Sequence, residues 1–226
     1  MIRNAALAFT LLAVGCASAG SGGRPLDAAA RRTLLLDPTH PEWTRPAPPV
    51  SNVTFTTTKG DFTIAVVRDW APIAADRFYN LARLGYYDDT RFHRVSDGYI
   101  VQWGLHGDPA VNDAWRGREL PDDPQRFSNA PATIGFAMEG PRTRNTQVYI
   151  NVGDNSRNDG EPFAIFGSIV EGMDVVRLLY SGYGEASGSG MRQNLQGPIE
   201  AGGNAYLDRE FPLLDRTLYV TVNPRM

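Results

Sequence analysis

Short runs of alternating apolar and polar residues predict β-strands through most of the chain beyond residue 52. Residues 53–58 and 61–67 alternate or carry β-branched side chains on either side of Lys59-Gly60, and this pattern predicts a β-hairpin. Four more runs have the length and composition of strands: 132–138, 146–151, 163–170 and 217–222. A chain with this many strands is expected to fold as a mainly β domain.

Helical periodicity is clear in only two places. Pro72 suits the first position of a helix, Ala74 and Phe78 follow on one face, and Gly85 is placed to end it. A second helix is predicted for residues 171–180. Closing the sheet would remove its exposed edges, so we expect a closed β-barrel with helices over its ends.

Two long segments lack a clear pattern and are predicted as loops. Residues 103–131 are polar and rich in Pro and Asp, and a loop this long in a compact domain is usually functional or packed by its own side chains. Residues 181–204 are rich in Gly and Ser, and we expect them to be mobile.

Two polar residues, Arg94 and Gln102, stand in apolar strand segments that are joined by a tight turn at Ser96-Asp97-Gly98. Because strand side chains alternate between faces, Phe92 shares a face with Arg94, and Ile100 shares one with Gln102. If these faces join, a guanidinium and an amide lie above an apolar floor. A lone buried charge is costly, so Arg94 is expected either to form a structural ion pair or to meet a substrate.

The first residues predict export from the cytoplasm. A basic start followed by a short apolar run is typical of a signal peptide, which we assign to residues 1–15. Cys16, the single cysteine, follows Ala13-Val14-Gly15, and this resembles the lipobox of bacterial lipoproteins, which implies a lipid on Cys16. By resemblance to lipoprotein sorting, Ala17 in place of aspartate favours the outer membrane of a Gram-negative cell. We therefore expect a lipoprotein on the periplasmic side of the cell envelope.

Between the lipid and the domain, residues 16–52 are predicted to be a lipid-anchored flexible tether. The segment opens with Gly and Ser, and its later prolines keep the chain extended. Within it, residues 27–36 suit a short helix with Asp27 as N-cap, and Trp43 is placed to dock on the domain. Residues 53–226 are assigned to the folded domain.

Composition narrows the range of partners. A net charge of −3 over 226 residues gives no reason to expect a nucleic-acid partner. A metal hydrolase using His93 and His106 is an alternative, but His93 is expected on the face opposite Arg94, and the usual metal-ligand spacings are absent from the sequence. We therefore expect neither a metal nor another cofactor.

Five motifs, in order, resemble the cyclophilin-type peptidyl-prolyl isomerases over residues 53–180 and on to 222. They are Ala71-Pro-Ile-Ala-Ala-Asp-Arg-Phe-Tyr-Asn-Leu81; Phe92-His-Arg94 with Gly98-Tyr-Ile-Val-Gln102; Phe136-Ala-Met-Glu-Gly-Pro141; Gln147-Val-Tyr-Ile-Asn151; and Val170-Glu-Gly-Met-Asp-Val-Val176. The resemblance implies a cyclophilin-like closed eight-stranded antiparallel β-barrel capped by two α-helices.

The resemblance also implies roles for individual residues. Arg94 matches the catalytic arginine, and Gln102 and Gln147 match the glutamines that hold the substrate backbone and the arginine. The remaining matches are to substrate-binding positions around the proline pocket: Phe92, Tyr99, Ile100, Ala137, Met138, Tyr149 and Phe163.

Three departures from the family pattern affect the pocket. Trp103 and the residues after it replace a common Gly-Gly-Asp continuation, so the mouth of the pocket is expected to differ. Residues 155–162 lack the rim tryptophan and leucine of several members and carry Arg157 instead, and Phe163 lies near the position of a rim histidine.

The predicted function is peptidyl-prolyl cis–trans isomerisation that assists the folding of proline-containing proteins in the cell envelope. The alternatives are a non-catalytic binding module or chaperone for proline-containing segments, and a purely structural envelope lipoprotein. The expected partners are proline-containing polypeptides and a membrane, through the lipid on Cys16. We expect a monomer.

Overall fold

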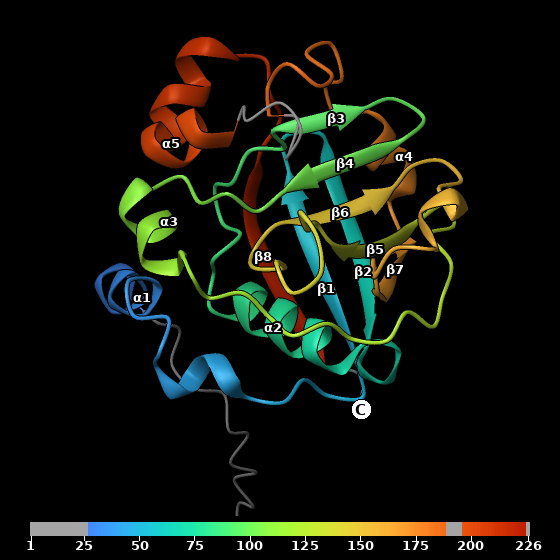
Figure 1. Ribbon diagram of the computed structural model, residues 1–226. Helices are drawn as coiled ribbons and strands as arrows, with labels where there is room; N and C mark the ends of the chain where they lie inside the picture. The colour runs from blue at the N-terminus through green and yellow to red at the C-terminus, as the bar shows by residue number, and fades with distance from the viewer. Residues whose placement is uncertain (1–26, 189–195, 225–226) are drawn as a thin grey trace, which may run out of the picture.

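A computed structural model describes residues 27–188 and 196–224 of the chain (Figure 1). The helical elements are α1 (Ala28–Leu35), η1 (Pro41–Thr44), η2 (Arg68–Trp70), α2 (Pro72–Arg83), α3 (Pro109–Trp115), η3 (Ser156–Asn158), α4 (Met173–Arg177) and α5 (Gln196–Glu210). The strands are β1 (Val50–Thr57), β2 (Gly60–Val67), β3 (Arg94–Ser96), β4 (Ile100–Trp103), β5 (Thr133–Phe136), β6 (Val148–Asn151), β7 (Ile165–Glu171) and β8 (Thr217–Pro224).

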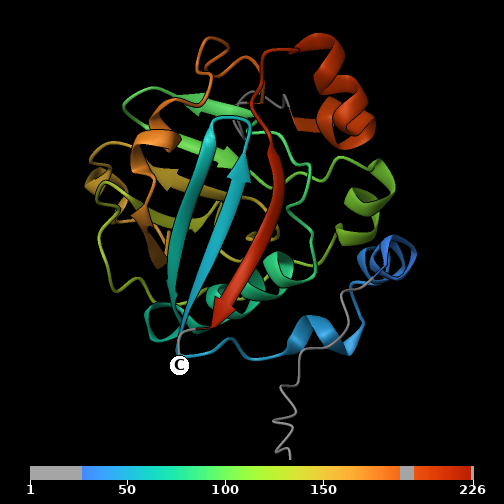
Figure 2. The same ribbon diagram turned by 180° about the vertical axis from the view of Figure 1, so that it is seen from behind.

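The eight strands form one antiparallel sheet in the order β3-β4-β6-β5-β7-β2-β1-β8. The sheet curls strongly, so that β1, β2 and β8 lie behind the shorter strands (Figures 1 and 2). The expected closure is found only in part, because β3 and β8 remain edges of the sheet. An isolated bridge between Arg91 and Arg216 joins the segments that lead into these two strands. The fold is therefore a strongly curled half-barrel.

The predicted hairpin is confirmed as β1 and β2, and it supplies much of the core. Phe55 and Phe62 face each other across the two strands, and their rings stack at 5.1 Å between centroids. Trp103 lies edge-on to Phe55 at 5.4 Å and is fully buried. Trp103, whose place the sequence left open, therefore packs in the core, whereas Leu105 from the same stretch lines the groove. Trp103 follows Gln102 on the strand, so its side chain points to the opposite face, into the core.

The predicted first helix is confirmed as α2, which covers one end of the curled sheet (Figure 1). Its N-cap residue, Ala71, has no side chain that can accept a hydrogen bond, so the cap comes from a distant loop. The carboxylate of Asp123 accepts the backbone N–H groups of Ile73 and Ala74, both at 2.9 Å. Asp123 also pairs with the fully buried guanidinium of Arg144 at 3.1 Å. The long loop is thus held in place by the helix that it caps.

The expectation of two helices is incomplete. The segment predicted as the loop 103–131 contains α3, which starts with an Asp108 N-cap and Pro109 at its first position. The prediction that residues 181–204 form a mobile loop is wrong for its last part, since α5 begins at Gln196. Two buried side chains of α5, Ile199 and Leu207, cluster with Leu105. This contact between distant parts of the chain stabilises α5 although glycines interrupt its sequence.

The structure also differs from the expected flexible tether. The predicted helix at residues 27–36 is confirmed as α1, and Trp43 packs edge-on against Trp115 at 4.8 Å. The indole N–H of Trp115 donates to the carbonyl oxygen of Leu35 at 2.9 Å. Residues 27–52 therefore belong to the folded body. The predicted signal peptide and Cys16 lie outside the described residues.

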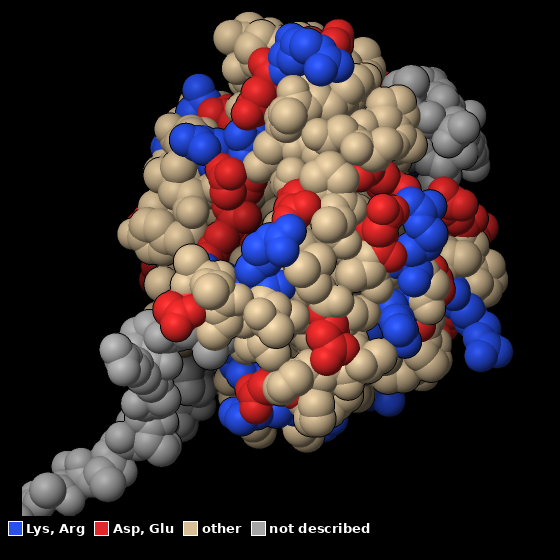
Figure 3. Space-filling view, turned by 90° about the vertical axis from the view of Figure 1, so that its left-hand side faces the viewer, with Lys and Arg blue, Asp and Glu red and all other residues tan. Residues whose placement is uncertain are grey.

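Helices α1, α3 and α5 occupy one side of the molecule (Figure 1). Acidic and basic side chains are interspersed on that side, without an extended basic surface (Figure 3). None of the helices in residues 27–188 and 196–224 is long and apolar enough to cross a membrane.

Candidate active site

An open groove of about 1350 Å³ runs across the face formed by β3, β4 and β6. Nine of the ten residues that the family resemblance assigned to catalysis or substrate binding line this groove: Arg94, Tyr99, Ile100, Gln102, Ala137, Met138, Gln147, Tyr149 and Phe163. Phe92 is the exception. It is fully buried, and its ring lies 5.4 Å from that of Trp103, so it supports the groove from within the core.

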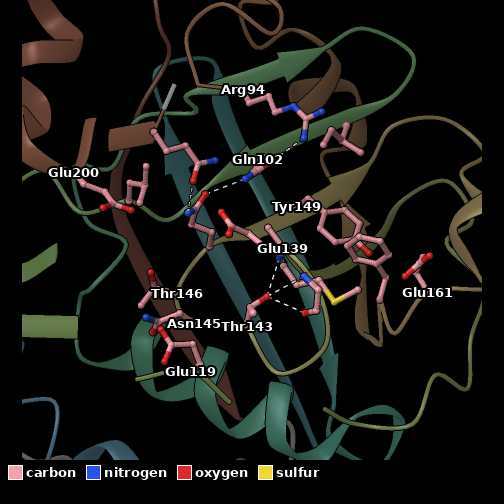
Figure 4. Close-up of a pocket in the computed structure, with 18 of the residues that line it drawn as sticks. Arg94, Gln102, Glu119, Glu139, Thr143, Asn145, Thr146, Tyr149, Glu161 and Glu200 are labelled. Carbon is pink, nitrogen blue, oxygen red and sulfur yellow. Dashed lines mark hydrogen bonds between the residues drawn. The ribbon is translucent and has the colours of Figure 1, made fainter. Parts of the chain in front are cut away.

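The polar residues of the groove form a hydrogen-bonded row across neighbouring strands. Arg94 on β3 and Gln102 on β4 are directly paired in the sheet. The Nη1–H of Arg94 donates to Oε1 of Gln102 at 3.0 Å. Figure 4 marks this hydrogen bond with a dashed line. Nε2–H of Gln102 then donates to Oε1 of Gln147 at 2.9 Å. Sheet register, set by the turn after Ser96, thus brings together three side chains that the sequence separates.

The apolar part of the groove is built around Tyr149. Its ring meets that of Phe163 edge-on at 5.8 Å, and its hydroxyl donates to Oδ1 of the buried Asn129 at 2.6 Å. Gly135 leaves room for this ring, because a Cβ at that position would lie only 2.8 Å from the Tyr149 hydroxyl. Burial raises the pKa of Tyr149, which remains a neutral phenol. The floor is therefore rigid and uncharged.

Residues 137 and 138 follow β5 at the groove edge. The backbone N–H of Ala137 donates to the carbonyl oxygen of Gln147 at 2.9 Å. This bond continues the ladder between β5 and β6, and it means that the Ala137 N–H is already used inside the domain. A peptide that pairs with this edge would have to use other backbone groups of the two residues.

Two groove residues were not identified from the sequence. The Nε–H of Arg94 donates to the carboxylate of Glu185, with distances of 3.0 and 2.9 Å to its two oxygens. At the other end of the row, Nε2–H of Gln147 donates to Oε1 of Gln196, the first residue of α5, at 2.8 Å. Both residues come from the segment predicted to be a loop, where strand or helix periodicity gives no signal for them.

Arg157 occupies the rim where the resemblance leads one to expect tryptophan. Its guanidinium lies 5.0 Å from the centre of the Tyr99 ring, and that of Arg94 lies 5.7 Å from it. Cation–π contacts of this kind stabilise both partners modestly. The rim therefore presents a positive charge close to the apolar floor.

The two histidines considered for a metal site do not act together. His93 is fully buried, and burial lowers its pKa to about 4. His106 instead accepts the backbone N–H of Asp108 with Nδ1 at 2.9 Å. Among the residues that the structure describes, no three His, Cys, Asp or Glu side chains gather as metal ligands would. The geometry gives no support to a metal hydrolase.

Comparison with known proteins gives the family. Residues 52–196, more than half of the chain, match the family described as "Cyclophilin type peptidyl-prolyl cis-trans isomerase/CLD". The chain belongs to this family.

Its relatives include short and long proteins. Peptidyl-prolyl cis-trans isomerase B of Escherichia coli is 32% identical over 161 residues, which cover 63% of this chain and 91% of the relative. Peptidyl-prolyl cis-trans isomerase cyp15 of Rhizopus delemar is 34% identical over 128 residues, but these cover only 20% of that protein. The chain therefore spans about a fifth of the longer relative.

A solved structure shows the same fold. The cyclophilin-type isomerase cgd2_1660 of Cryptosporidium parvum aligns with a TM-score of 0.57 over 78% of this chain and 99% of its own, at 20% identity. A second structure of that protein was determined in the presence of the dipeptide Ala-Pro and aligns with a TM-score of 0.55 at 19% identity.

Proposed function

We propose that this protein catalyses the cis–trans isomerisation of Xaa–Pro peptide bonds, and that the groove binds the proline-containing segment. One observation carries the proposal. A guanidinium, Arg94, is joined to two glutamine amides beside an apolar floor, on the fold of an isomerase family. Family membership supports the reaction, and the groove supplies the groups that the reaction needs.

The reaction needs few chemical groups. The peptide C–N bond has partial double-bond character, so rotation about it meets a barrier of about 20 kcal/mol. In the twisted transition state this resonance is lost, and the prolyl nitrogen becomes a better hydrogen-bond acceptor. A donor aimed at that nitrogen stabilises the transition state more than either ground state, which is the condition for catalysis.

Arg94 suits the role of that donor, because a guanidinium stays charged and presents its N–H groups in a fixed plane. Gln102 and Gln147 each carry an acceptor and two donors, so they can hold the arginine and a substrate backbone together. Tyr149 and Phe163 offer the proline ring an apolar slot. Met138 lies at the edge where the flanking backbone of the substrate would run.

We further propose that the protein acts in the cell envelope, on the periplasmic side, as a monomer anchored in the outer membrane by a lipid on Cys16. The basic start, the short apolar run and the position of the single cysteine support this placement. Mass analysis of the protein purified from the membrane fraction tests it. A diacylglyceryl mass on Cys16, lost in Cys16→Ser, is expected; an unmodified cysteine would refute the anchor.

Arg94→Ala tests the proposed reaction. The rate of cis–trans exchange in a proline tetrapeptide, measured by NMR exchange spectroscopy, should rise with wild-type protein. Removing the donor should lower kcat/KM by about 100-fold, as for other transition-state donors. The control is Arg209→Ala, which removes a 67% exposed arginine on α5, outside the groove.

The same experiment distinguishes the proposed isomerase from the main alternative, a non-catalytic binding module. If wild-type protein bound the peptide without accelerating exchange, the chain would be a binding module and the proposed activity would be wrong. If Arg94→Ala were as active as wild type, the role assigned to Arg94 would be wrong even though the protein is an isomerase.

A further inference from the structure

The polar row of the groove extends further than the three residues predicted from the sequence. Glu185, Arg94, Gln102, Gln147 and Gln196 form a continuous series of side-chain hydrogen bonds. Figure 4 shows its central part, from Arg94 through Gln102. The three inner residues come from the curled sheet, whereas both ends come from one part of the chain, residues 181–188 and 196–210, which we call the C-terminal segment.

Arg94 donates in both directions along the row, to Glu185 on one side and to Gln102 on the other, and from Gln102 onward each amide donates to the next. Arginine can only donate, so Gln102 must turn its oxygen to Arg94 and its NH₂ group to Gln147. Gln147 in turn donates to Gln196, whose own amide donates to the carbonyl oxygen of Gly188 at 3.4 Å. The orientation of each amide is thus set by its neighbours. A change at either end removes a constraint on the whole row.

Glu185 contacts the side of the guanidinium and leaves its tip accessible. Its carboxylate accepts from Nε, while Nη1 reaches Gln102. The ion pair is partly exposed, with 19% of the Arg94 side chain and 41% of the Glu185 side chain accessible. An exposed pair adds little to stability. The ion pair has a larger effect on geometry. An arginine side chain has several rotatable bonds, and the bond to Glu185 fixes the orientation of the Arg94 guanidinium plane.

We propose that the C-terminal segment positions the catalytic groups, with Glu185 holding the Arg94 guanidinium and Gln196 holding the Gln147 amide. The inference rests on the proposed isomerase function. Correct placement of a catalytic group can change a rate by orders of magnitude. The active groove is therefore assembled from the sheet and from a segment whose two contacting residues, Glu185 and Gln196, lie at the end of the family match.

Three variants test the role of Glu185. Glu185→Ala removes the acceptor and should lower kcat for the proline peptide by about tenfold with little change in KM, because the guanidinium loses its orientation. Glu185→Gln keeps an acceptor for Nε–H and should recover most of that loss. Glu210→Ala is the matched control, since it removes a 46% exposed carboxylate of the same segment outside the groove, and it should leave kcat unchanged.

Two kinetic outcomes would overturn the inference. An unchanged kcat in Glu185→Ala would mean that the ion pair is only structural. An increase in kcat/KM would mean that Glu185 competes with substrate for Arg94. Neither result would affect the proposed isomerase activity, which is judged from wild type and Arg94→Ala alone.

A measurement without substrate tests the same geometry. The Arg94 Nε–H resonance should exchange slowly with water in wild type and in Glu185→Gln, and fast in Glu185→Ala. Gln196→Ala should broaden or shift the side-chain amide resonances of Gln147. If both sets of resonances were the same in wild type and variants, the C-terminal segment would not hold these groups in solution, and the inference would be wrong whether or not the protein proves to be an isomerase.

Discussion

Replacing Asp123 by alanine should be one of the most destabilising single changes in the domain. The Asp123 carboxylate is almost fully buried and accepts from the backbone of Ile73 and Ala74 and from Arg144. Breaking a buried ion pair on one side costs about 3–5 kcal/mol, because the remaining charge is uncompensated. Loss of the helix cap adds about 1 kcal/mol.

Two remaining contacts of Arg144 reduce this loss. Its guanidinium also donates to the carbonyl oxygen of Pro121, and it lies 3.4 Å from the Asp122 carboxylate. We therefore take the lower end for the ion pair and expect Asp123→Ala to lose about 4 kcal/mol of unfolding free energy in total. That is a large part of the roughly 5–15 kcal/mol that stabilises a typical domain.

Urea unfolding followed by fluorescence measures this difference. The control is Asp113→Ala, which breaks an exposed pair with Arg116 and should change the unfolding free energy by less than about 0.5 kcal/mol. The double variant Asp123→Ala/Arg144→Met removes both buried charges and should regain much of the loss. A loss below about 1 kcal/mol in Asp123→Ala would refute the reasoning, since neither the cap nor the buried pair would then contribute as calculated.

Two further predictions concern buried residues next to the groove. The pKa of His93 is about 4 in the folded protein and near 6.5 when unfolded, so the unfolded state binds the extra proton as the pH falls. The unfolding free energy should therefore drop by about 2 kcal/mol between pH 7 and pH 5 because of His93. In His93→Gln this part of the drop should be missing, as measured by urea unfolding at both pH values. If the unfolding free energy fell equally with pH in wild type and in His93→Gln, the prediction would be wrong. Trp103→Ala should lower the unfolding free energy by about 3–5 kcal/mol, and Trp103→Phe should lower it much less. Neither variant should change kcat of the folded protein. A reduced kcat in Trp103→Phe would instead place Trp103 at the groove.

Local patterns were sufficient for the elements that form the groove wall. Alternation predicted that Phe92 shares a face with Arg94 and that Ile100 shares one with Gln102, and the structure pairs Arg94 with Gln102 in the sheet. The same rule puts Trp103 on the opposite face, in the core, where the structure has it. The family resemblance gave no place for Trp103, because members commonly have glycine at this position.

The parts that were mispredicted depend on contacts between distant segments. Helix α5 contains three glycines at 197, 202 and 203, and Gly203 interrupts it with φ +56°, so its sequence resembles a loop. Its stability comes from the cluster of Ile199 and Leu207 with Leu105, which no local pattern shows. Glu185 is 91 residues from Arg94 along the chain. Only the folded chain brings that carboxylate to the guanidinium.

If Cys16 carries the proposed lipid, the docking of residues 27–52 on the domain limits how far from a bilayer the groove can reach. Had the chain from Cys16 to residue 52 hung free, a lipid on Cys16 would have allowed the domain to travel up to about 130 Å from its anchor. With the folded body starting at Asp27, the connection spans about 40 Å at most. Under the proposed lipidation, the enzyme would therefore act on polypeptides at or close to the membrane surface.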